Sequence, residues 1–185
     1  LRKRNEAYYR KFPEDVKRVR RIASFIHNSD PTTHSIPLPA GGRLTVPGFL
    51  ALGIAFGTHG GLDEVHNTVL RMDADLETFG FLTRGTLATV EAGIAWEGHP
   101  IYALLHECIY FANPPTRRVE VGEHEVPELG WAAYQVGALD PHFSWLRGED
   151  AIATLLNSDQ PLYFSGEMIF PIHISSSPSL SPFLR

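Results

Sequence analysis

Apolar residues recur at intervals of three and four along this chain, and this helical period limits its possible folds more than any other feature. Two stretches, 16–26 and 62–76, show the period most clearly. Their apolar positions are Val16, Val19, Ile22, Ala23 and Ile26, then Leu62, Val65, Val69, Met72 and Leu76. The pattern predicts two amphipathic helices, each with one face packed against a core.

Residues that begin and end helices flank these stretches. Pro13 precedes two acids, Glu14 and Asp15, and both features suit the first turn of a helix. Glycines at 60–61 interrupt the chain before the second stretch, and Thr83 can cap a third helix. These signals place helix boundaries close to the points where the apolar period begins.

The remaining segments are shorter and favour the same fold class. Helices are expected over 46–56, 100–109, 131–137 and 150–156, loops over 28–42 and 113–129, and a short strand over 161–164. Residues 175–185 are rich in Ser and Pro and indicate disorder. We therefore predict a mainly α fold, with a helical domain over 1–171 and a disordered or divergent tail over 172–185.

The composition favours a folded domain, for which the cytoplasm is the default compartment. Of 185 residues, 43% are hydrophobic and 11% aromatic, which is enough for a core. No apolar run approaches the roughly 20 residues that span a bilayer, so no membrane partner is expected. Cys108 is the single cysteine, and the lack of an internal disulfide is compatible with a reducing compartment.

Positive charge is concentrated near the start of the sequence. Residues 1–21 contain nine Lys/Arg and three Asp/Glu, although the whole chain has a net charge of −5. A basic stretch of this kind can bind nucleic acid. No nucleic-acid motif accompanies it, so we interpret it as the solvated face of a helix and expect no nucleic-acid partner.

The common catalytic motifs are missing from the sequence. There is no Gly-x-Ser-x-Gly nucleophile turn, no P-loop and no dinucleotide-binding glycine fingerprint. His106-Glu107 begins like a zinc-peptidase signature, but Tyr110 occupies the position of the second histidine. We therefore predict no catalytic residue and no cofactor in this chain.

One weaker metal candidate is the set His59, Asp63 and His66. Asp63 and His66 are three residues apart, so they would lie one turn apart on the same face of a helix. A fourth ligand is missing, and histidines near glycine turns are common without metals. We therefore predict no metal site, with a small metal-binding helical domain kept as an alternative.

Two glutamates are placed where a carboxylate needs a partner. Glu107 lies on the expected 100–109 helix, both faces of which favour partial burial, and burial of an unpaired charge is costly. A bound ammonium group, an arginine or His106 could satisfy it. Glu167 follows the expected strand after Gly166 and is surrounded in sequence by apolar residues. An ion pair with an arginine is the structural alternative for Glu167.

Seven segments, in the same order, resemble the cap domain of proline iminopeptidases (prolyl aminopeptidases) of the fungal and actinobacterial type. The resemblance covers roughly residues 1–171. The segments are Asn5–Val16 with Arg18–Ile22, Leu38–Thr45, Leu52–Gly53 with Phe56–Gly57, Val65–His66, Leu104–Glu107 with Ile109–Tyr110, Trp131–Ala133 and Phe164–Pro171.

The resemblance implies a function. Enzymes of this family are α/β-hydrolases that release N-terminal proline from peptides, with a Ser-His-Asp triad on a sheet domain and a helical cap over the pocket. Acidic residues of the cap recognise the free amine. Carried over to this sequence, Glu107 and Glu167 would bind that amine, and Tyr110 and Trp131 would help form the apolar wall for the pyrrolidine ring.

The resemblance also implies what this chain lacks. The family's nucleophile lies upstream of the matching segments, and its acid and histidine lie downstream, so the hydrolase sheet would be largely absent and the chain inactive alone. The family pattern ends at Pro171, which suggests a truncated or mispredicted product. The apolar surface left uncovered favours self-association. The alternative function is a non-catalytic helical interaction module derived from such a cap.

Overall fold

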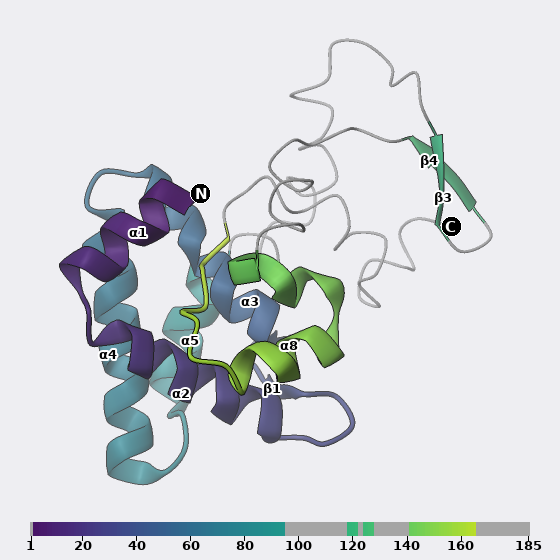
Figure 1. Ribbon diagram of the computed structural model, residues 1–185. Coiled ribbons are helices and arrows are strands. Elements are labelled where there is room, and N and C mark those ends of the chain that lie inside the picture. Colours follow the sequence, from purple (N-terminus) through teal and green to yellow (C-terminus); the bar gives the residue numbers. More distant parts are fainter. Residues whose placement is uncertain (1, 95–117, 122–123, 128–140, 166–185) are drawn as a thin grey trace.

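The computed structural model describes residues 2–94, 118–121, 124–127 and 141–165, and these are mostly helical (Figure 1). The α-helices are α1 Arg2–Lys11, α2 Asp15–Asn28, α3 Val46–Leu50, α4 Gly61–Phe79, α5 Arg84–Gly93 and α8 Glu149–Leu156. The 3-10 helices are η1 Ala51–Gly57 and η2 Pro141–Arg147. The strands are β1 Ser35–Pro37, β2 Arg43–Thr45, β3 Arg118–Val121 and β4 His124–Pro127.

The long helices lie where the apolar period predicts them. α2 and α4 cover the two periodic stretches, and their apolar faces pack against one another. Gly60 and Gly80 flank α4 with φ values of 78° and 74°, a left-handed conformation that glycine adopts without strain. Thr83 caps α5 by accepting a hydrogen bond from the Thr86 backbone N–H. The predictions for these helices and for 150–156 are confirmed.

Two other predictions are partly right. The buried helix expected over 46–56 is present as α3 followed by η1, and Thr45 caps it through a 3.1 Å bond from the Gly48 N–H. The segment 28–42, expected to be a loop, contains β1, which pairs antiparallel with β2. The helices expected over 100–109 and 131–137, and the tail over 172–185, lie outside the described residues.

The short strand predicted over 161–164 is wrong. Residues 161–165 have no strand assignment and do not pair with any strand in the described part of the chain. Their polar backbone groups bond instead to side chains and to helical backbone, because helices surround this segment. The polar excursion expected over 113–129 contains the antiparallel hairpin of β3 and β4, in which Val119 lies opposite Val126.

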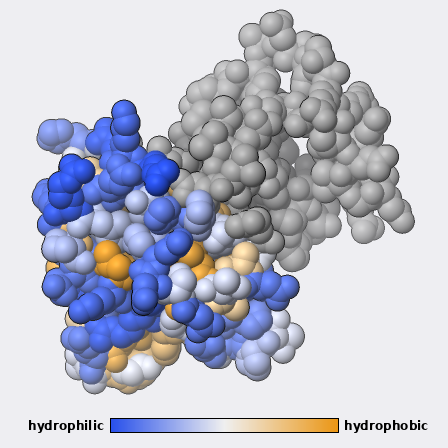
Figure 2. Space-filling model, viewed as in Figure 1, coloured by the Kyte–Doolittle hydropathy of each residue, from blue (hydrophilic) through white to orange (hydrophobic). Residues whose placement is uncertain are grey.

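The core lies between α2, α4, α3 with η1, and the segment 161–165. Its largest fully buried side chains are Trp145, Tyr8, Phe49, Phe164, Ile22, Ile26, Leu44, Leu50, Met72, Ile152 and Leu162. Burial of each such side chain stabilises the fold by about 1.5–3 kcal/mol. The face in Figure 2 is largely hydrophilic over the described residues. None of the helices described here is both long and apolar enough to cross a bilayer.

Asp30 organises the turn that leads into β1. Its Oδ1 atom accepts hydrogen bonds from the backbone N–H groups of Thr32 (2.8 Å) and Thr33 (3.0 Å), and its Oδ2 atom lies 3.1 Å from the Arg43 guanidinium. The hydrogen bond from the Thr33 side chain, then these backbone bonds, lower the pKa of Asp30 from 3.8 to about 2.

We expect the Asp30 carboxylate to titrate near pH 2 in the folded chain. Replacement of Thr33 by valine removes the side-chain hydrogen bond and should raise this pKa. Because the folded pKa is depressed, the stability that Asp30 contributes is present above its unfolded pKa of 3.8 and is lost as the pH falls through about 2. A carbon-detected NMR titration of the Asp30 side chain measures its pKa in the parent chain and in the Thr33→Val variant. A midpoint near 3.8 in the native chain contradicts the prediction.

Candidate functional site

The four residues predicted to bind substrate, Glu107, Tyr110, Trp131 and Glu167, all lie outside the described residues. Their placement therefore remains a prediction. What the structure does describe is the segment Pro161–Ser165, which ends immediately before the Gly166-Glu167 pair. The way this segment is held determines how firmly the chain is supported where Glu167 begins.

Asn5 of α1 forms hydrogen bonds with both the carbonyl and the N–H of Phe164. The Asn5 Nδ2 atom donates to the Phe164 carbonyl at 2.9 Å, and the Phe164 N–H donates to the Asn5 Oδ1 atom at 2.7 Å. Asn5 is fully buried. Its carboxamide thus takes the place of a partner strand, and it satisfies two backbone groups that would otherwise be buried without partners.

Three more hydrogen bonds hold the same segment, one from α1 and two from other elements. The Ser165 N–H donates to the Leu50 carbonyl at 3.0 Å, and the Trp145 Nε1–H donates to the Tyr163 carbonyl at 3.1 Å. The Tyr9 hydroxyl donates to the Leu162 carbonyl. The segment is therefore fixed by α1, α3 and η2 together.

Gly53 of η1 lies directly against this segment. A Cβ atom at this position would overlap the Ser165 carbonyl oxygen and would lie 2.5 Å from the Phe164 Cβ atom. Only glycine allows the two backbones to approach so closely. Phe56 of the same element packs against Phe164, with ring centroids 5.5 Å apart, and against Tyr8 at 5.1 Å.

A second polar cluster joins α1, α2 and α4 around Asp15, which is fully buried. Its Oδ2 atom accepts from the Tyr8 hydroxyl at 2.5 Å and lies 2.7 Å from the His66 Nδ1 atom, and its Oδ1 atom accepts from Arg18 at 3.0 Å. Burial, strengthened by the bond to Asp15, raises the pKa of Tyr8 far above its usual range, so its hydroxyl stays a donor. We call these four residues the Asp15 network.

The His59, Asp63 and His66 set does not come together as a metal site. Asp63 pairs with Lys11, whose Nζ atom lies 2.7 Å from Oδ1 and lowers the pKa of the Asp63 carboxyl through that hydrogen bond. His66 bonds to Asp15 and stacks on Phe12 at 3.7 Å between ring centroids. Among the described residues, a different group, His27 with His34 and Glu149, brings one potential ligand atom of each residue within 4.8 Å of the other two.

Several of the basic residues near the start of the chain bond within the fold. Arg20 donates to the carbonyls of Leu155 and Leu156 at the end of α8, at 3.1 and 2.9 Å. Arg21 binds Asp73 at 2.7 Å, and this hydrogen bond raises the pKa of its guanidinium. The sequence predicts the solvated face of a helix for this stretch, and these contacts show that Arg20 and Arg21 also have partners within the fold.

Four of the seven segments that carry the family resemblance therefore meet in the described part of the chain. Asn5 and Gly53, from two of these segments, contact Phe164, which begins a third. Asp15 and His66, from the first segment and a fourth, bond to one another. Residues far apart in the sequence thus form one platform, composed of α1, η1 and 161–165, that leads to Gly166-Glu167.

No family model matches the sequence, but two curated aminopeptidases do. "Proline iminopeptidase aneH" of Aspergillus aculeatus is 36% identical over 169 residues, which are 91% of this chain and 31% of that protein. "Proline iminopeptidase" of Aeromonas sobria is 28% identical over 168 residues, 91% of this chain and 32% of that protein. The chain thus spans about a third of the length of either relative.

These matches confirm the family resemblance. The chain corresponds to a region of a peptidase-related protein. More particularly, it is related to proline iminopeptidases, and the mainly helical architecture is consistent with the cap portion of such an enzyme.

Proposed function

We propose that this chain acts as the substrate-recognition cap of a proline iminopeptidase-type serine hydrolase. In this proposal Glu107 and Glu167 bind the ammonium group of a peptide's free N-terminus, and Tyr110 and Trp131 contact the pyrrolidine ring. The serine, acid and histidine of the triad are supplied by a hydrolase domain. The chain alone is inactive, and the cytoplasm is its expected compartment.

The contact of two family segments, through Asn5 and Gly53, with Phe164 of a third is the observation that supports this proposal. A charged group recognises a ligand well only if its backbone is held in place, because loose positioning weakens each bond. Asn5, Leu50 and Trp145 hold the segment whose chain continues into Glu167. A charge-assisted hydrogen bond to an amine contributes about 1.5–3 kcal/mol.

A chimera tests the proposal. Residues 1–171 replace the matching region of the Aspergillus aculeatus proline iminopeptidase, and release of arylamine from proline arylamide is measured. We expect the chimera to be active, and we expect Glu107→Gln and Glu167→Gln each to lower kcat/KM by about 10- to 150-fold, as loss of a charge-assisted bond predicts.

Two controls make the result specific. Glu64→Gln, an exposed acid on α4, should leave kcat/KM of the chimera unchanged. The 185-residue chain alone should release no arylamine. A folded chimera without activity, or equal effects of the Glu64 and Glu167 variants, contradicts the cap proposal. In that case the interaction-module alternative gains support if the chain captures one stoichiometric protein partner.

A further inference from the structure

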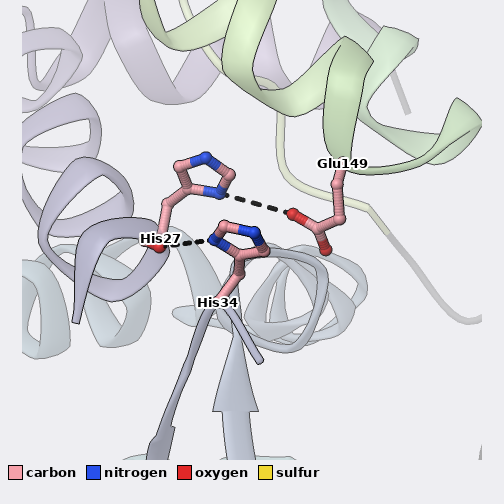
Figure 3. Close-up of side chains that lie close together, drawn as sticks. All are labelled: His27, His34 and Glu149. Atoms are coloured by element: carbon pink, nitrogen blue, oxygen red, sulfur yellow. Dashed lines mark hydrogen bonds and ion pairs between the residues drawn. The ribbon is translucent and has the colours of Figure 1, made fainter. Parts of the chain in front are cut away.

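Two histidines and a glutamate from three separate elements meet at one side of the helical domain. His27 lies in the last turn of α2, His34 precedes β1, and Glu149 is the first residue of α8. Figure 3 shows both rings next to the Glu149 carboxylate. One potential ligand atom from each residue lies within 4.8 Å of the other two.

The hydrogen bonds of this cluster orient its nitrogen atoms. The His34 Nδ1 atom lies 2.9 Å from the His27 backbone carbonyl. A ring that donates Nδ1–H to a carbonyl presents an unprotonated Nε2 atom, which is the usual arrangement for a metal-binding histidine. In Figure 3 the other nitrogen of His34 lies on the side of Glu149.

His27 provides a second indication of a ligand site. Its Nδ1 atom is buried and forms no hydrogen bond of acceptable geometry within the described residues. The Glu149 Oε2 atom lies 3.3 Å away, and this contact is an ion pair only when the ring is protonated. Buried polar atoms without a hydrogen bond are uncommon in folded proteins, so this nitrogen is available to a ligand.

The backbone of His34 is also unusual. Its φ is 47°, and it is the one residue other than glycine with positive φ among the described residues. This conformation is disfavoured for residues with a side chain and often marks functional sites. Here it places the His34 ring against that of His27, with centroids 4.4 Å apart and ring planes 12° apart.

We propose that His27, His34 and Glu149 bind a zinc ion that links α2, the loop before β1 and α8. Two imidazole nitrogens and one carboxylate oxygen form a ligand set that zinc accepts, with water in the fourth position. The stacked rings are nearly parallel, so binding requires one ring to turn and the three ligand atoms to move closer. Glu149 is half exposed, so the ion can enter from solvent.

This site differs from the recognition site proposed above and does not depend on it. It also departs from the expectation, based on the sequence alone, that the chain has no metal site. Because the ligands come from three elements, bound zinc would stabilise the packing of α8 against α2 by binding the folded state only.

Zinc titration of the purified, untagged 185-residue chain tests the proposal by calorimetry. We expect one equivalent of bound zinc and a higher Tm in its presence. Loss of even an indirect partner of a metal ligand lowers affinity about 10- to 100-fold, so His34→Ala and Glu149→Gln should each lower zinc affinity at least tenfold and abolish the Tm increase. Cobalt absorption bands report tetrahedral coordination in the same chain.

His59, which is exposed between η1 and α4, provides the matched control, since His59→Ala should bind zinc like the parent chain. Glu149→Gln changes only a half-exposed side chain, so it tests the site even if His34→Ala fails to fold. Binding of less than about one-tenth equivalent overturns the proposal. So does zinc affinity that neither Glu149→Gln nor a folded His34→Ala reduces, because the ion then binds elsewhere.

Discussion

Replacement of Asp15 by alanine is expected to lower the free energy of unfolding by about 3–5 kcal/mol, the range measured when one partner of a buried ion pair is removed. The Asp15 side chain is fully buried, and its loss leaves the Tyr8 hydroxyl without its acceptor and the Arg18 guanidinium with its 3.4 Å contact to Asp73. His66 loses its partner as well. Urea denaturation followed by circular dichroism measures the change. Arg18 and His66 retain some solvent contact, so the lower half of the range is favoured.

Asp63→Ala is the matched control for Asp15→Ala. Asp63 also pairs with a cation, Lys11, but both side chains are about half exposed. Exposed pairs contribute little to stability, because water screens them and their side chains lose entropy, so Asp63→Ala should lower the free energy of unfolding much less than Asp15→Ala. If the two variants lose the same stability, the Asp15 network does not stabilise the junction of α1, α2 and α4.

The helices of this fold could be predicted from the sequence because their signals are local. The apolar period and the Thr83 cap each need only a few neighbouring residues to be recognised. Asp15 was interpreted from the same local information as an acid that complements the first turn of α2. Its burial depends on His66, 51 positions away, and no local pattern could show that.

The strand predicted over 161–164 failed for a related reason. An apolar run of four residues fits a strand or any other buried extended segment, and only its neighbours decide between them. In the fold, the neighbour of Phe164 is the side chain of Asn5, 159 positions earlier. The substrate contacts of Glu107 and Glu167 remain predictions, since both glutamates lie outside the described residues.

Asn5→Ala is expected to lower the free energy of unfolding by at least about 2 kcal/mol. The change leaves the N–H and the carbonyl of Phe164 without the two bonds that Asn5 provides, and each unsatisfied buried group costs about 1–3 kcal/mol. Urea denaturation measures the loss. Asn67→Ala, an exposed position on α4, should change stability by no more than about 0.5 kcal/mol.

Hydrogen exchange separates a local effect of Asn5 from general destabilisation. In the parent chain the Phe164 amide donates to Asn5, whereas the Ser165 amide donates to the Leu50 carbonyl. Asn5→Ala should therefore speed exchange at Phe164 more than at Ser165, because only the first amide loses its acceptor. Equal acceleration of both amides would show that Asn5 supports the fold as a whole. In that case its carboxamide does not specifically position the chain that continues into Glu167.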